Sequence, residues 1–207
     1  FVYSLVTKCF YDKSHYQDYD VLTKYRKELS NSGHLLEVTN SSSGFNLYEL
    51  GKSKKSVQSM LRHSRTSKKM QRLLYRLGAF FKPEHVLELG THLGMGTTAI
   101  CLGAKPTQLI TVEDCPETAN YSQNQFKLWA KSQMVLKNIQ TANNFFENFL
   151  KDRQDSNSDY LTTKLFDLIY FSGQENGTTL MYYFETLKKY CHEKTVLIIS
   201  DIHCSLD

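Results

Sequence analysis

The sequence has no long apolar run, and this absence excludes one class of protein. Among the 207 residues there is no stretch of about 18 apolar residues, so we predict no transmembrane helix. The first residues, Phe1–Val6, follow no basic stretch and carry no cleavage-site pattern, which argues against a signal peptide. They also lack an initiator Met, so we expect a fragment or a trimmed chain.

Paired cysteines and a strong net charge are missing as well. The five cysteines are scattered, odd in number and free of any CxxC motif, which argues against a disulfide framework and favours reduced thiols in a cytoplasmic protein. The net charge of +4 is too small to indicate nucleic acid or a membrane by itself. The content of 41% hydrophobic and 22% charged residues is ordinary for a globular protein with one sizeable core plus an extension.

The apolar periodicity divides the chain into a helical extension, residues 1–82, and an α/β domain, residues 83–207. Residues 1–30 show helical spacing of apolar side chains, with a polar break at Tyr11–Asp20. Asn31-Ser32-Gly33 is a stop signal for a helix. After it, His34–Val38 is predicted as a strand or extended segment, and Thr39–Gly44 as a loop.

Residues 51–82 are strongly basic, with ten Lys or Arg and no acid. One interpretation is a surface for an anionic partner, such as RNA or a phosphorylated substrate. The other is the solvated face of helices, because Leu73, Leu74 and Leu77 supply an apolar stripe. We favour the second, since aromatic stacking residues are not interleaved with the charges.

From residue 85 onwards, short apolar runs alternate with helical patterns. The predicted strands are His85–Leu89, Gln108–Glu113, Val135–Thr141, Phe166–Phe171 and Thr195–Asp201. The predicted helices are Gly96–Gly103, Pro116–Lys131, Asn144–Lys151 and Gly177–His192. This alternation predicts a Rossmann-like, doubly wound and mostly parallel sheet, in which ligands bind beyond the carboxyl ends of the strands.

The first of these strands ends in a glycine-rich turn, Glu88-x-Gly90-x3-Gly94-x-Gly96. Such a turn joins a buried strand to a helix whose N-terminus faces a ligand. The spacing differs from the G-x-G-x-x-G of dinucleotide sites. The acid suits S-adenosylmethionine, which carries a sulfonium and an ammonium group and no phosphate. The alternative is that the glycines only form a tight turn.

Two later strand ends supply further candidates for cofactor binding. Glu113 ends the second strand and can accept hydrogen bonds from both hydroxyls of a ribose. Asn144 follows the third strand and can pair with the adenine edge, although helix capping explains it equally well.

The last two strands supply the candidates for catalysis. Asp167 lies early in the fourth strand and is interpreted as structural, and Ser172 follows that strand. Asp201 and His203 alternate at the end of the fifth strand, where His203 can act as a general base that Asp201 supports. These two residues alone would make a weak metal site, so we predict no metal.

With these segments assembled, residues 85–204 resemble a class I S-adenosylmethionine-dependent methyltransferase. The resemblance rests on V-L-E-L-G-T-H-L-G-M-G-T, I-T-V-E-D-C-P-E-T-A and I-I-S-D-I-H-C-S. It is closest to O-methyltransferase-like proteins of the Bacteroidetes type. The N-terminal helical extension of that group is also similar to two segments of this chain, F-V-Y-S-L-V-T-K-C-F and R-L-G-A-F-F-K-P.

The resemblance implies S-adenosylmethionine as cofactor and methyl transfer to the oxygen of a small molecule. It implicates Glu88, Gly90, His92, Gly94, Gly96 and Glu113 in holding the cofactor. Ser172, which we count with them, stands where the family usually has an aspartate, so metal dependence is not expected. The resemblance also implies that two C-terminal strands of the family fold are missing. The alternative function is a non-catalytic module that binds S-adenosylmethionine, or binds RNA through residues 51–82.

Overall fold

The computed structural model describes residues 1–39, 52–132, 139–143, 165–172 and 177–200. Its strands are β1 (Leu35–Thr39), β2 (Lys52–Ser56), β3 (His85–Leu89), β4 (Gln108–Glu113), β5 (Ile139–Asn143), β6 (Phe166–Phe171) and β7 (Cys191–Ile199). Its α-helices are α1 (Val2–Leu5), α2 (Asp18–Ser30), α3 (Val57–Arg62), α4 (Lys68–Phe81), α5 (Met95–Ala104), α6 (Pro116–Ser132) and α8 (Gly177–Leu187). A π-helical turn, Val6–Phe10, follows α1, and a 3-10 turn, Lys188–Tyr190, follows α8.

Five strands form a parallel sheet in the order β5-β4-β3-β6-β7. The chain runs outward from β3 to β4 and β5, and then returns to β6 on the other side of β3. The strand order therefore reverses between β3 and β6, which is where open α/β sheets bind their ligands. The predicted Rossmann-like α/β fold is confirmed.

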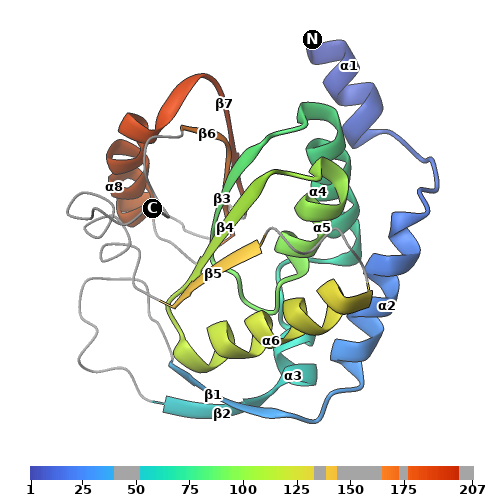
Figure 1. Ribbon diagram of the computed structural model, residues 1–207, viewed down its shortest axis with the longest axis vertical. Helices are drawn as coiled ribbons and strands as arrows, with labels where there is room; N and C mark the ends of the chain where they lie inside the picture. Colours follow the sequence, from blue (N-terminus) through green and yellow to red (C-terminus); the bar gives the residue numbers. More distant parts are fainter. Residues whose placement is uncertain (40–51, 133–138, 144–164, 173–176, 201–207) are drawn as a thin grey trace.

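Alternate side chains of the strands feed two separate cores. Val86, Leu109 and Leu168 face one side of the sheet and join a core with α2, α4 and α5. Leu87 and Ile169 face the other side and pack with Leu187 of α8. Figure 1 shows the same layers, with α8 on one side of the sheet and α4, α5 and α2 on the other.

The N-terminal helices pack closely on this α/β layer. A Cβ on Gly103 of α5 would lie 2.1 Å from the backbone oxygen of Tyr75 in α4, and one on Gly78 of α4 would lie 3.0 Å from the nitrogen of Ala104. The two glycines thus let the helix backbones approach each other. Tyr19 and Leu22 of α2 are buried in the same core as Val86 of the sheet, so the predicted extension and the predicted domain share one core.

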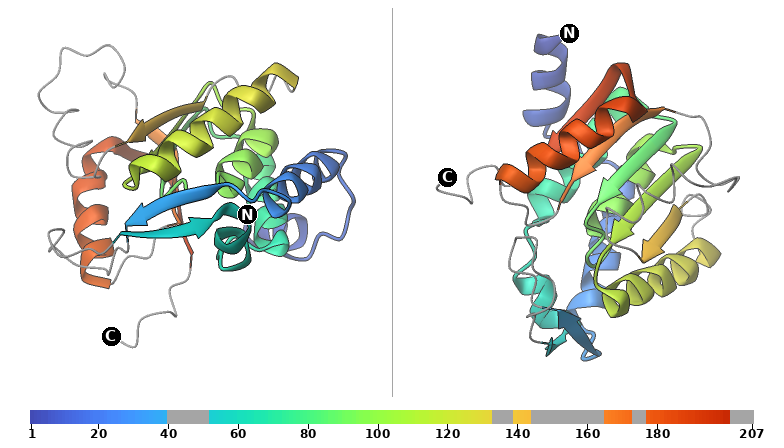
Figure 2. Two further views of the ribbon diagram at one scale, coloured as in Figure 1. Left: turned by 90° about the horizontal axis from the view of Figure 1, so that it is seen from below. Right: turned by 90° about the vertical axis from the view of Figure 1, so that its left-hand side faces the viewer.

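The β1–β2 hairpin lies against the start of α6, beyond the carboxyl end of β4. The amide of Glu37 donates a hydrogen bond of 2.6 Å to Glu117 Oε2, and Cys115 Sγ lies 3.7 Å from the Glu37 oxygen. From below, the hairpin crosses the front of the molecule (Figure 2, left). The hairpin is therefore close to the edge of the sheet at which a ligand is expected.

Four sequence predictions need correction. The interpretation of residues 51–82 as helical faces is wrong for residues 52–56, which pair with β1 as a strand made of Lys and Ser alone. The helix predicted to His192 ends at Leu187, and β7 begins at Cys191 rather than at Thr195. The third strand is described over Ile139–Asn143, and residues 133–138 lie outside the described part of the chain.

Side-chain hydrogen bonds hold the first residues of β7 against β6. Thr195 Oγ1 donates a hydrogen bond of 2.7 Å to the oxygen of Phe166 and accepts one from the amide of His192. Asp167 accepts hydrogen bonds from the amides of Glu84 and His85, and one of its oxygens lies 2.9 Å from His192 Nε2. These bonds join the amino ends of β3, β6 and β7. They agree with the structural role predicted for Asp167.

Within the described ranges, none of the helices combines the length and the hydrophobicity that crossing a membrane requires.

Candidate functional site

The turn between β3 and α5 uses backbone angles that glycine adopts easily. Gly90 has φ of 94° and Gly94 has φ of 74°, whereas His92 lies between them with φ of 48° despite its side chain. The amide of Gly90 donates a hydrogen bond of 2.8 Å to the oxygen of Val112 in β4, and the amide of Gly94 donates one to Thr91. The turn is therefore held against the end of the neighbouring strand.

Gly94 and Gly96 leave room for other side chains of this protein. A Cβ on Gly94 would lie 2.5 Å from the ring of Phe126 in α6. A Cβ on Gly96, in the first turn of α5, would lie 2.6 Å from Glu88 Oε1 and 2.9 Å from Tyr170 Cε1. The second and third glycines of the motif thus allow α5 to settle over Glu88 and beside α6.

Glu88 is buried beneath α5, with only 1% of its surface exposed. Its Oε2 accepts hydrogen bonds from the hydroxyls of Thr97 and Thr111, whereas Oε1 has no hydrogen-bond partner among the described residues. Burial raises the pKa of Glu88 to about 7, although the two hydroxyls act to lower it. A buried carboxyl with one unpaired oxygen is an acceptor that a hydrogen-bond donor or a cation would stabilise.

Glu113 lies at the carboxyl end of β4 and points back to the glycine turn. Its Oε2 accepts a 2.8 Å hydrogen bond from the amide of His92, and its Oε1 accepts one of 3.2 Å from the amide of Cys115. Burial, and then the charge of Asp114, raise the pKa of Glu113 to about 8. Each oxygen has a second lone pair, so the carboxylate can accept two further hydrogen bonds.

His92 lies on the same turn, where burial lowers the pKa of its imidazole to about 4. The positive charge of Lys55 adds to this effect, which places the β1–β2 hairpin near the turn. His92 is therefore neutral at physiological pH. Nothing in the sequence pattern linked Lys55 to this site, because residues 52–56 lack the apolar alternation that predicts a strand.

Ser172 follows β6, on the other side of the point where the strand order reverses. Its hydroxyl donates to the oxygen of Gly90 and, at 3.2 Å, to the oxygen of Leu89, and its amide donates to Leu89 as well. Ser172 thus ties the end of β6 to the glycine turn. The structure brings together the turn, Glu113 and Ser172, whereas Asn144, Asp201 and His203 lie outside the described residues.

Tyr25 of α2 supports the turn from the N-terminal helices. Its hydroxyl donates a buried hydrogen bond of 2.8 Å to the oxygen of Leu93, and its ring meets Trp129 edge-on with 5.2 Å between centroids. Next to it, Arg26 Nη1 lies 3.0 Å from Met95 Sδ. In the sequence, Tyr25 belongs only to the helical apolar spacing of residues 1–30. Its hydroxyl was the one signal of a further role.

We expect Tyr25→Phe to lower the free energy of unfolding by about 1–3 kcal/mol, because the buried oxygen of Leu93 would lose its donor. Urea unfolding followed by circular dichroism measures this change. Tyr11→Phe is the matched control, since Tyr11 is 75% exposed and should tolerate the loss of its hydroxyl. Equal stability of the two variants would contradict the role given to Tyr25.

This arrangement fits a ligand that has neighbouring hydroxyls and a positive charge. The carboxyl groups of Glu113 and Glu88 supply acceptors, one at the edge of the sheet and one beneath α5. Among the described residues, no group of three His, Cys, Asp or Glu side chains is placed to hold a metal ion. The two carboxyl groups suit an organic cofactor with a ribose and a positive charge.

A family of proteins described as "methyltransferase domain" matches residues 87–202, more than half of the chain. The chain belongs to this methyltransferase family. The match begins at β3 and contains the glycine turn, Glu113 and Ser172. No curated protein matches the chain. The finer resemblance to the Bacteroidetes type stays a prediction, because neither the family match nor the structural matches single out that group.

Solved structures of methyltransferases share the fold. The SAH-bound methyltransferase PaMTH1 from Podospora anserina has a TM-score of 0.60 and 15% identity, covering 96% of this chain and 68% of its own. The O-methyltransferase TomG from Streptomyces achromogenes, in complex with SAM, has 0.56 and 14%, covering 90% and 66%. The O-methyltransferase from Bacillus cereus, in complex with SAH, has 0.56 and 13%, covering 94% and 74%. The chain thus spans about two thirds to three quarters of their lengths.

Proposed function

We propose that this methyltransferase domain binds S-adenosylmethionine at the glycine turn and transfers its methyl group to the hydroxyl oxygen of a small molecule. The observation that carries the proposal is the placement of Glu113. Its carboxyl group lies at the end of β4, hydrogen-bonded to the amide of His92, at the edge where α/β sheets bind adenosyl cofactors. The solved structures with the same fold that contain SAM or SAH support the choice of cofactor.

Residues of this chain would hold the cofactor as follows. Glu113 would accept hydrogen bonds from the two ribose hydroxyls, and Gly90, His92, Gly94 and Gly96 would shape the turn around them. Glu88 would act from beneath α5, where its unpaired oxygen adds negative charge close to the turn. Ser172 would set the distance between the turn and β6.

When bound, S-adenosylmethionine supplies a methyl group on a sulfonium, which a nucleophile attacks in line. The chain would orient the acceptor hydroxyl and remove its proton. We assign His203 as the base that accepts the proton of the acceptor hydroxyl, and Asp201 as the residue that orients the imidazole ring. The N-terminal extension, residues 1–82, would cover the cofactor and shape the acceptor site.

The test is transfer of a labelled methyl group from S-adenosylmethionine to a panel of phenols and other small hydroxyl compounds. We expect transfer to oxygen, and we expect His203→Gln to slow it by about 10²–10⁴-fold while cofactor binding is retained. Labelling of nitrogen or carbon acceptors instead of oxygen would contradict the proposed reaction. Full activity of the His203→Gln variant would contradict the assigned base.

The raised pKa values of the two carboxyl groups predict that cofactor binding depends on pH. Because the pKa of Glu113 is about 8 and that of Glu88 about 7 in the free protein, both groups are largely protonated at about pH 6. The ribose hydroxyls and the sulfonium favour the ionised forms, so binding releases protons. We expect the Kd to rise as pH falls from about 8.5 to about 6, by up to tenfold per pH unit for each proton released.

Calorimetric titrations across this range, in buffers with different ionisation enthalpies, measure both the Kd and the protons released. The Glu113→Gln variant is the control, since it removes the group with the higher pKa and should show a weaker dependence on pH. A Kd that stays constant over the range would contradict the role of these carboxyl groups.

A further inference from the structure

A second candidate site lies between α2, α3 and α4. It is a pocket of about 320 Å³, and four of its lining residues are cations, Arg26 and Lys27 from α2 and Lys68 and Arg72 from α4. None of the described residues that line it is acidic. A pocket with this lining attracts anions.

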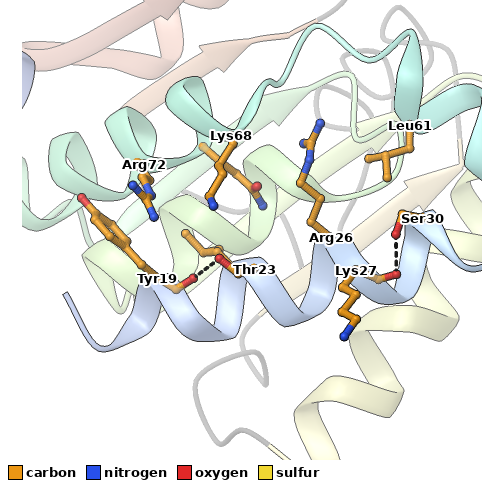
Figure 3. Close-up of a pocket in the computed structure, with 10 residues that line it drawn as sticks. Tyr19, Thr23, Arg26, Lys27, Ser30, Leu61, Lys68 and Arg72 are labelled. Atoms are coloured by element: carbon orange, nitrogen blue, oxygen red, sulfur yellow. Dashed lines mark hydrogen bonds between the residues drawn. The ribbon is translucent and has the colours of Figure 1, made fainter. Parts of the chain in front are cut away.

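The cations differ in how far they are engaged. Lys68 and Arg72 make no hydrogen bond or ion pair with a described residue, although the guanidinium of Arg72 lies 4.7 Å from the centre of the Tyr19 ring. Arg26 uses Nη1 to donate to the oxygen of Thr66, at 2.9 Å. Figure 3 shows Lys68 and Arg72 reaching from α4 toward α2, and Arg26 reaching back toward α4, whereas Lys27 points away. Lys68 and Arg72 therefore extend side by side toward α2, and Arg26 lies farther along the same pocket.

The nearby Arg76 shows what a structural arginine on this helix does. Its Nε donates to the oxygen of Cys9 at 2.6 Å, and its Nη1 donates to the hydroxyl of Tyr19 at 2.9 Å. Arg72 and Lys68, one and two turns before it on α4, have no such acceptors. Their charges are left available for a ligand.

The other lining residues define the class of ligand. The hydroxyl of Thr23 donates to Tyr19 and that of Ser30 to Lys27, so each can only accept a hydrogen bond from a ligand. The donors that remain are the cations and the amide of Gln71, and arginine's planar fork suits phosphate oxygens. Three positive charges favour a doubly charged phosphate over a single carboxylate. Leu22 and Leu61 add an apolar wall that an organic group can contact.

We propose that this pocket binds the phosphate group of a small molecule. Its volume is that of a small-ligand site, and Tyr19 is 2% exposed, so it offers no stacking platform for nucleic acid bases. The lining of this pocket includes none of the residues assigned to the cofactor, although Arg26 also contacts Met95 at the start of α5, and phosphate binding here does not depend on methyl transfer.

Calorimetric titration of the whole chain with inorganic phosphate and with phenyl phosphate tests the proposal. We expect one-to-one binding that weakens at least tenfold in the Lys68→Gln, Arg72→Gln double variant. A Lys69→Gln, Lys127→Gln double variant is matched in charge, changes only exposed lysines outside the pocket, and should bind within about twofold of wild type. Tighter binding of phenyl phosphate would indicate a phosphate ester, and equal binding the phosphate group alone.

A measurement on the unmodified chain covers the case in which the double variant fails to fold. Adding phosphate should shift the NMR signals of the guanidinium groups of Arg26 and Arg72 and leave that of Arg62 unchanged. Three results would overturn the proposal: no binding, equal weakening in both double variants, or tighter binding of an RNA oligonucleotide that both double variants weaken equally.

Discussion

Glu113→Gln should weaken the binding of S-adenosylmethionine by at least about 100-fold, since two hydrogen bonds to a charged group contribute about 1.5–3 kcal/mol each. The carboxylate accepts one amide hydrogen bond on each oxygen, from His92 and Cys115. A glutamine has only one oxygen, so its NH₂ group would face one of these donors. The variant therefore loses both the charge and the fit to the turn. Calorimetric titration measures the change in Kd.

The neighbouring acid supplies the control for this experiment. Asp114 is exposed, and its charge reaches the site by raising the pKa of Glu113. Asp114→Asn should therefore bind the cofactor at least as well as the wild type near neutral pH. If Glu113→Gln bound as tightly as the wild type, or if Asp114→Asn caused the larger loss, the ribose assignment would be wrong.

Gly103→Ala should lower the free energy of unfolding by about 3 kcal/mol, at the upper end of the range for overpacked sites. The new methyl group would lie 2.1 Å from the oxygen, 2.9 Å from the carbon and 3.1 Å from the Cα of Tyr75. These are backbone atoms of α4, so no side chain can rotate away and α4 itself must move off α5. Urea unfolding measures the change.

Gly33→Ala is the matched control, because a Cβ there has no atom within 4 Å. It should change the stability by less than about 1 kcal/mol. The comparison also tests the boundary predicted between residues 82 and 83. If the N-terminal helices were a loosely attached domain, Gly103→Ala would unfold them separately and leave the stability of residues 83–207 unchanged. A single cooperative transition that shifts as a whole would support one shared core.

The part of the chain around the glycine turn was the most predictable from sequence. β3 and β4 are near-continuous apolar runs with sharp ends, and the structure confirms both to the residue. α5 was also predicted within one residue at each end. Such runs are typical of parallel strands buried on both faces, so the pattern has few other solutions.

Other features depended on contacts that the sequence does not display. Residues 52–56 form a strand because they pair with β1, in which Leu36 and Val38 are buried, and not because of their own pattern. Phe126, which is 32 residues after Gly94, fills the space beside that glycine. Glu88, which is 8 residues before Gly96, fills the space beside the other. Local spacing cannot reveal such partners.

The position of Glu88 was in part predictable. Side chains alternate along a strand, so Glu88 shares the face of Val86, which packs in the core with α5. Its carboxyl group must therefore lie beneath the helix. The hydroxyls of Thr97 and Thr111, which donate hydrogen bonds to this carboxyl group, come from two different elements. Only the fold brings them together.

The measurement that tests the central claim most directly is calorimetric titration of the chain with S-adenosylmethionine and with S-adenosylhomocysteine. The arrangement of the glycine turn, Glu113 and Ser172 predicts one-to-one binding of both, with protons released below about pH 8 because the pKa of Glu113 is raised. NADH, titrated alongside, should produce no binding heat, since the glycine spacing differs from that of dinucleotide sites. No heat from either adenosyl compound, or binding of NADH in their place, would contradict the account.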